Sequence, residues 1–160
     1  GTSVAVAYIP IVRAKYPDQP PYQWTVNETS PWTALEKELA KCRVALVSTS
    51  GAYIKDQQPP FGLVKNDLSF RQIPRDVDVR DLAIAHHFAQ PDAKEDINCT
   101  FPIERLRELE QEGFIGELAP TAYTCMGRIF LRSKLNNEMA PWLIEQLRKE
   151  QVDAALLVPV

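Results

Sequence analysis

Apolar runs of strand length outline the predicted sheet. Residues 43–51 hold an apolar run that ends in small polar residues and a glycine, and residues 152–160 form a second apolar run. Unbroken runs of this kind are typical of strands that are buried on both faces of a parallel sheet. The short apolar run within residues 81–85 predicts a further short core strand. Residues 69–74 alternate in polarity and end in proline, which favours a strand at the edge of the sheet.

Two helices are predicted in the second half of the chain from their starts, their ends and the repeat of their apolar positions. Pro102 starts the first helix and Gly113 ends it. Residues 136–137 are the expected cap of the second helix, with Pro141 in its first turn. One face of the first helix carries an apolar stripe among charged residues: Ile103, Leu106 and Leu109.

The alternation of strands and helices predicts an α/β fold. We expect a mostly parallel, Rossmann- or flavodoxin-like sheet with flanking helices. A chain of 160 residues has the size of one domain. Residues 1–32 are predicted to form an extended N-terminal arm, because residues before proline are pushed out of the helical region. Residues 33–160 are then a single α/β domain.

Composition excludes several classes of protein and leaves an ordinary globular one. The net charge of -3 and the pI near 5.4 are far from the basic balance of a nucleic-acid-binding domain. The longest apolar stretch, residues 4–12, is interrupted by Pro10 and is much shorter than a membrane span. Three cysteines without a C-x-x-C pair, together with two histidines, argue against a disulfide framework and a closed zinc site. We therefore expect a reduced, cytoplasmic protein with no nucleic-acid or membrane partner.

A loop rich in histidine and acids follows the strand predicted at residues 81–85. His86 and His87 precede Asp96 and two further acids in this loop. A cluster of this kind can hold a divalent metal or transfer protons. The alternative is a solvated loop, because adjacent histidine side chains diverge and no helical spacing presents two ligands together. No metal ligands are therefore assigned.

Two cysteines lie at positions where a thiol could take part in chemistry. Cys99 precedes the start of the first helix, where the helix dipole stabilises a thiolate. Cys125 follows a predicted strand. The alternative for both is the usual role of a free cysteine, a small buried apolar residue. Near the end of the strand at residues 43–48, Ser50 and Gly51 are small enough for backbone N–H groups to approach a ligand.

Three segments together resemble the selenoprotein B family of the glycine, sarcosine, betaine and D-proline reductases, especially its D-proline reductase-like members. The segments are residues 43–51, residues 68–76 and the longer stretch from Asp96 through Gly127. The stretch from Asp96 is the most specific of the three. Residues 43–160 follow the family order throughout.

The resemblance implies reductive chemistry at a selenocysteine or cysteine. In the family this redox centre follows the strand that corresponds to residues 156–160, so it is expected beyond Val160, and no cofactor is expected within the chain. His86, Asp96 and Cys99 match the family's polar loop and are the expected catalytic residues. The expected substrate-binding residues are Ser50, Gly51, Asn98, Cys125, Met126 and Gly127.

Three functions remain open from the sequence. The first is a reductase that cleaves a C–N or related C–heteroatom bond of a small, amino-acid-like substrate, with a thiol or protein electron donor. The second is a non-catalytic subunit or binding module that completes a site with a partner chain in a homo- or hetero-oligomer. The third is a metal-dependent hydrolase that uses the loop containing His86 and Asp96.

Overall fold

The computed structural model describes residues 8–18, 28–86 and 91–160, in two compact units. The first unit, Gly1–Ala34, contains one described helix, α1 (Tyr8–Lys15). Pro10 lies in the first turn of α1, where the missing N–H needs no partner, so the proline is compatible with the helix. Residues 4–7 lie outside the described part of the chain. The second unit, Leu35–Val160, holds the sheet.

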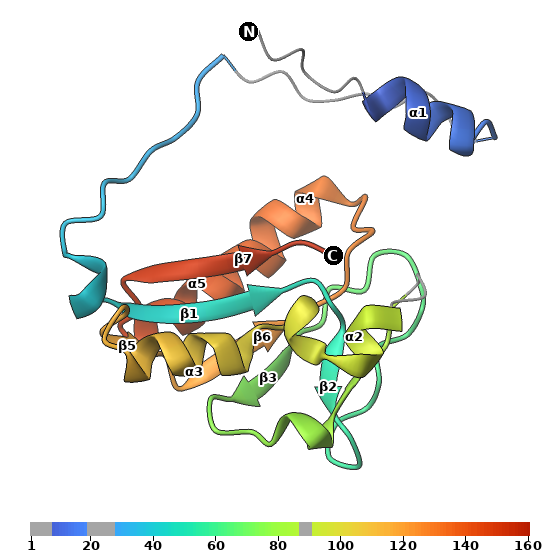
Figure 1. Ribbon diagram of the computed structural model, residues 1–160. Helices are drawn as coiled ribbons and strands as arrows, with labels where there is room; N and C mark the ends of the chain where they lie inside the picture. The colour runs from blue at the N-terminus through green and yellow to red at the C-terminus, as the bar shows by residue number, and fades with distance from the viewer. Residues whose placement is uncertain (1–7, 19–27, 87–90) are drawn as a thin grey trace, which may run out of the picture. The chain divides into compact units, whose positions relative to one another are not determined.

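The main sheet is built around β1 (Arg43–Ser48), as Figure 1 shows. On one side, β7 (Ala154–Val158) runs parallel to β1 over five paired positions. On the other side, β5 (Glu117–Leu118) pairs with the start of β1 and β6 (Thr121–Thr124) with its end, both parallel. The antiparallel strand β3 (Arg71–Pro74) closes this side, at the edge where its proline is tolerated. The α/β fold with a mostly parallel sheet is confirmed.

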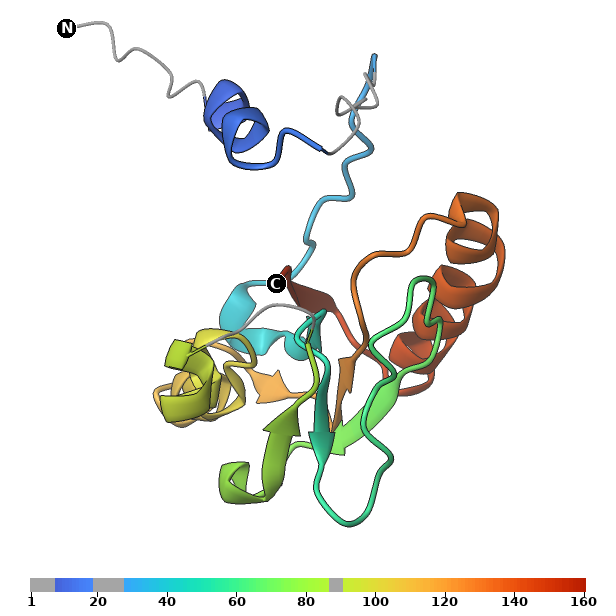
Figure 2. The ribbon, with the colours of Figure 1, turned by 90° about the vertical axis from the view of Figure 1, so that its right-hand side faces the viewer.

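Two helical segments cover opposite faces of the sheet (Figures 1 and 2). On one face, α3 (Ile103–Gln111) packs through Ile103 and Leu106 against a core that includes Leu46 and Phe101. On the other face, α5 (Ala140–Lys149) places Trp142 edge-on to Tyr123 of β6, with the ring centroids 6.1 Å apart. In the sheet, β5 and β6 together occupy the position on one side of β1, and β7 occupies the position on the other side. Counted in chain order, these positions run second, first, third, which is the beginning of a flavodoxin-like sheet.

The second helical segment begins earlier than the sequence predicted. It starts with α4 (Arg132–Lys134), continues through the π-helical segment η4 (Leu135–Met139) and runs into α5. Residues 136–137 therefore lie inside a continuous helical run, and the prediction that they cap a helix is wrong. Pro141 cannot donate a backbone hydrogen bond, and the wider turn of η4 just before it accommodates that loss.

A small antiparallel ribbon stands apart from the main sheet. It pairs β2 (Ala52–Ile54) with β4 (Leu82–Ile84). The predicted core strand at residues 81–85 exists, and Leu82 packs in the same hydrophobic core as β1, but the strand pairs within this ribbon and not within the main sheet. In β2, which follows β1 along the chain, Ala52 and Ile54 are buried. The remaining short elements are η1 (Leu39–Lys41), η2 (Val79–Asp81), α2 (Pro91–Glu95) and η3 (Ile97–Cys99).

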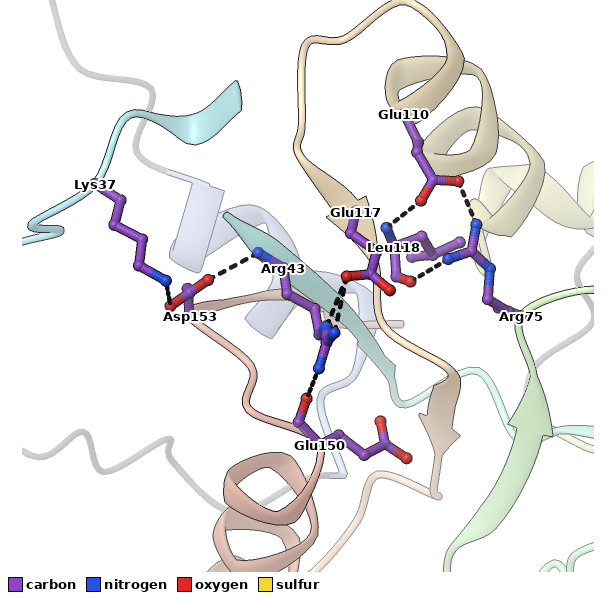
Figure 3. Close-up of polar contacts among 8 residues, drawn as sticks. All are labelled: Lys37, Arg43, Arg75, Glu110, Glu117, Leu118, Glu150 and Asp153. Carbon is purple, nitrogen blue, oxygen red and sulfur yellow. Dashed lines mark hydrogen bonds and ion pairs between the residues drawn. The ribbon is translucent and has the colours of Figure 1, made fainter. Parts of the chain in front are cut away.

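Polar contacts fasten the amino ends of the strands (Figure 3). The Arg43 guanidinium pairs with the Glu117 carboxylate at 2.9 Å, and the backbone N–H of Arg43 donates to Asp153 at 2.9 Å. Glu110 accepts hydrogen bonds from Arg75 and from the backbone N–H of Leu118. Burial alone would raise the pKa of Glu110, but these two hydrogen bonds outweigh it and leave that pKa below its ordinary value. These pairs hold β1, β5, β7 and α3 in register at the end of the sheet opposite the candidate site.

The burial of β7 differs from the prediction. Residues 152–160 were expected to form a buried strand, but among the described residues β7 is the outermost strand on its side, and its middle is exposed. Leu156 and Leu157 have 41% and 67% of their surface exposed. An apolar run alone cannot distinguish an interior strand from an uncovered edge strand, because the distinction depends on the neighbouring elements.

Candidate functional site

The carboxyl ends of β1, β6 and β7 meet at one edge of the main sheet. Ser50, just after β1, forms an isolated antiparallel bridge with Met126, just after β6. The backbone N–H of Gly51 donates to the Cys125 carbonyl at 3.1 Å. On the other side, the N–H of Val160 donates to Thr49 Oγ1 at 2.8 Å. In open α/β sheets, ligands bind at this edge, at the point where the strand order reverses, which here lies between β1 and β7.

Gly51 joins this edge to the β2–β4 ribbon through a contact that only glycine permits. Its φ is +68°, and a Cβ atom there would lie 2.2 Å from the Ala85 carbonyl oxygen and 2.6 Å from Met126 Sδ. The N–H of Ala85 in turn donates to the Gly51 carbonyl at 3.0 Å. This close approach places the residue after Ala85, His86, beside the carboxyl edge of the sheet.

Ser48 fixes the start of the polar loop to the same edge. Its side chain is fully buried, and its Oγ donates to the Thr100 carbonyl at 2.7 Å while accepting from the Ser50 N–H at 3.1 Å. The turn that contains Asp96, Asn98 and Cys99 is thereby held close to the end of β1.

A cavity of about 1010 Å³ lies between the ribbon, α2 and η3. His86 and Asp96 both line it, so the structure brings these two predicted residues to one cavity. Its wall combines apolar groups with charged side chains of both signs, a mixture suited to a small charged ligand. The other charged residues of the wall are Lys55, Arg80, Lys94, Glu95 and Glu104.

Asn98 links two carboxylates of the cavity wall. Its Nδ2 donates to Asp96 Oδ1 at 2.8 Å and to Glu104 Oε2 at 2.7 Å, and its Oδ1 accepts from the Glu104 N–H at 3.1 Å. The hydrogen bonds from the Asn98 side chain and backbone hold the pKa of Asp96 below its ordinary value. Asp96 is therefore ionised at neutral pH and suits the role of a hydrogen-bond acceptor better than that of a proton donor.

The two cysteines of interest have opposite environments. Cys99 is exposed in η3, so the alternative that it is a small buried apolar residue is wrong. Cys125 is buried, and its burial raises the pKa of its thiol to about 11. The Cys125 thiol is therefore protonated at neutral pH.

We expect the cysteines to react with iodoacetamide at very different rates at pH 7.5. Cys99 should be alkylated first, because its thiol is accessible. Cys125 should react much more slowly, because a pKa raised from 9.0 to about 11 lowers its thiolate fraction roughly 100-fold relative to a thiol of ordinary pKa, and burial limits access further. Peptide mass spectrometry over a time course measures both rates. Rapid labelling of Cys125 in folded protein would contradict this assignment.

The predicted site residues fall into groups. Ser50, Gly51, Cys125 and Met126 lie together at the sheet edge, His86 and Asp96 line the cavity, and Asn98 supports Asp96. None of the other predicted site residues lines the cavity: Ser50, Gly51, Asn98, Cys99, Cys125, Met126 and Gly127. His87 lies outside the described residues.

The sequence did not point to three charged residues of the cavity wall. Lys55 and Arg80 lie in polar segments that resemble ordinary loops. Glu104 is one of several charged residues on the first predicted helix, and it lines the cavity and accepts a hydrogen bond from Asn98. Glu104 follows Asn98 by six residues, and this short separation was the only feature of the sequence that could have indicated the contact.

The described residues, 8–18, 28–86 and 91–160, contain no group of three histidine, cysteine or acidic residues arranged to hold a metal ion. They also contain no helix whose length and apolar character would let it cross a membrane.

Comparison with known proteins identifies the family. The family profile described as Glycine/sarcosine/betaine reductase selenoprotein B (GRDB) matches residues 22–160. A D-proline reductase subunit gamma from Acetoanaerobium sticklandii is 42% identical over 127 residues, which cover 79% of this chain and 52% of that protein. The chain therefore spans about half the length of this curated relative. No solved structure matches the chain. The chain belongs to the glycine/sarcosine/betaine reductase selenoprotein B family.

Proposed function

We propose that the full-length protein is a reductase that cleaves a C–N or related C–heteroatom bond of a small, amino-acid-like substrate. The observation that carries the proposal is the 42% identity to a D-proline reductase subunit over most of this chain. The cavity supports it, because side chains of both signs surround a space large enough for such a substrate.

His86 is the proposed proton donor to the leaving group. Bond cleavage leaves an electron pair on the departing nitrogen, and an imidazolium at the cavity wall can supply the proton that this nitrogen needs. Asp96, whose pKa is lowered by Asn98, is proposed to accept a hydrogen bond from the substrate. The other residues proposed to contact the substrate lie outside the cavity wall: Ser50, Gly51, Asn98, Cys125, Met126 and Gly127.

The redox centre is proposed to lie just beyond Val160. A selenolate or thiolate there would attack the substrate carbon and form a C–Se or C–S bond as the C–N bond breaks. A second thiol would then attack that selenium or sulfur, and the carbon would leave with a proton. The resulting selenenylsulfide or disulfide would take two electrons from a thiol or protein donor. The hydrogen bond between Val160 and Thr49 Oγ1 supports this position, since a residue that follows Val160 starts from the carboxyl edge of β1. In the same region, Ser48 holds the Thr100 turn that carries Cys99. Cys99 is exposed there and is the proposed auxiliary thiol.

The test is substrate reduction by the full-length protein purified with its native partner subunits under anaerobic conditions. D-proline, glycine, sarcosine and betaine are supplied in turn with dithiothreitol, and product formation is measured. With the preferred substrate, His86→Gln should lower kcat by roughly 100- to 10,000-fold, the usual contribution of general acid catalysis. Glu112→Gln, at an exposed position after α3, is the matched control and should retain activity. Absence of turnover with all four substrates would contradict the proposed reaction, and full activity of His86→Gln would contradict its role.

A non-catalytic subunit that completes a site with a partner chain is the second candidate. The uncovered side of β7 favours it, because that side offers a place for another chain. Intact mass and selenium content of the native full-length protein separate the two candidates. A protein without a selenocysteine or cysteine after Val160 would favour the non-catalytic subunit.

A further inference from the structure

The outer edge of β7 presents backbone groups that point away from β1. Among the described residues, β7 pairs with β1 alone. The Thr49 N–H donates to the Val158 carbonyl at 3.1 Å, so the polar groups of Val158 face β1. Successive residues of a strand direct their backbone groups to alternate sides. The N–H groups of Ala155 and Leu157 therefore face the open edge.

Both faces of β7 are apolar and exposed. Leu156 and Leu157 point to opposite faces, and 41% and 67% of their surfaces are accessible. Natural edge strands are usually shielded by a charge, a proline or a bulge, because an open apolar edge invites pairing. The five residues of β7 are alanine, leucine and valine only. The composition of β7 is thus that of an interior parallel strand.

The topology indicates what covers this edge. The parallel strands occur in the order second, first, third, and the third strand, β7, is the one from which a flavodoxin-like sheet grows. The matched relative is about twice as long as the segment that aligns with it, so the family has enough additional chain for further strands. We propose that β7 is an interior strand of the full-length protein, and that residues following Val160 return to add a parallel strand at its open edge.

This completed sheet would add a wall to the candidate site. The loop after the new strand would emerge beside the carboxyl end of β7, next to Val160 and Thr49, on the side away from β6. The inference concerns the architecture and does not depend on the proposed reaction. A full-length protein without reductase activity would leave it unaffected.

Hydrogen exchange in the full-length protein tests the proposal directly. A version with cysteine in place of any selenocysteine is suitable, with residue-level exchange measured by NMR or by electron-transfer fragmentation. The amides of Leu156 and Val158, which face β1, are internal controls and should exchange slowly. The amides of Ala155 and Leu157 should be protected to within about tenfold of these controls, because an interior strand is hydrogen-bonded on both edges. Fast exchange at Ala155 and Leu157 beside protected controls would overturn the proposal.

A pair of variants gives an independent measurement. In the full-length protein, Leu157→Lys should lower Tm by roughly 8 °C or more, because it places a charge at a covered position. Phe114→Lys is the matched control, since Phe114 is 58% exposed and follows α3, far along the chain from β7. Equal, small shifts for both variants would contradict the proposal.

A second copy of the chain is the competing occupant of the edge. Analytical ultracentrifugation across a hundredfold dilution distinguishes it, with hydrogen exchange repeated at each concentration. Protection of Ala155 and Leu157 that persists in the monomer supports the intramolecular strand. Protection that disappears as a dimer dissociates would overturn it in favour of pairing between copies.

Discussion

Replacing Gly51 by alanine is expected to destabilise the chain by roughly 4 kcal/mol or more. Two effects combine at this position. A residue with a Cβ atom is strained at a φ of +68°, and that Cβ would meet the Ala85 carbonyl oxygen at 2.2 Å. The clash could be relieved only if the backbone at Gly51, after β1, moved away from the backbone at Ala85, after β4. Urea unfolding followed by circular dichroism measures the loss.

Gly113→Ala is the matched control for Gly51→Ala. Gly113 has a similar φ of +72°, but no atom lies within 4 Å of its hypothetical Cβ. Only the conformational cost applies there, and we expect a loss of roughly 1 kcal/mol. Equal effects of the two substitutions would show that the contact between Gly51 and Ala85 is unimportant.

The second large effect is expected from Leu46→Ala in the centre of β1. Leu46 is fully buried and belongs to the core cluster with Phe101 and Ile103. Truncation leaves a cavity in this closely packed region and should lower the free energy of unfolding by roughly 3–5 kcal/mol. Thermal and urea unfolding of the 160-residue chain measure this change.

Leu156→Ala is the control for this second prediction because Leu156 is the direct partner of Leu46 in the sheet register. Leu156 is 41% exposed, so in the 160-residue chain its truncation should cost less than about 1.5 kcal/mol. Comparable losses at the two positions would contradict the assigned burial. In a full-length protein with a completed sheet, the cost at Leu156 should rise toward that at Leu46.

The segments with strong local signals were predicted correctly. The apolar run at residues 43–48 became β1, and the proline and glycine around α3 marked its two ends. The proline at the end of β3 correctly indicated an edge strand. In each of these cases the local sequence restricts the backbone directly, so neighbouring elements were not needed for the prediction.

The errors arose where several local arrangements were compatible with the sequence. A short apolar strand can join any nearby partner, and β4 pairs with β2 instead of entering the main sheet. The second helix was predicted to begin at residues 136–137, because asparagine often caps a helix and Pro141 fits a first turn. The helical run instead starts at Arg132 and passes through η4 before Pro141. The accessibility of Cys99 likewise depends on the packing around η3, which no local pattern specifies.

For the candidate site too, some features follow from the local sequence and others from the tertiary structure. The sequence by itself determined the family resemblance, the strand ends at Ser50 and Cys125, and the polar loop with His86 and Asp96, because these depend on residue type and order. Only the tertiary structure decided that His86 and Asp96 share a cavity with Lys55, Arg80 and Glu104, and that β7 is left open. The physical reason is that a cavity or an uncovered edge results from contacts between segments distant in sequence. Burial, pKa and accessibility all depend on those contacts.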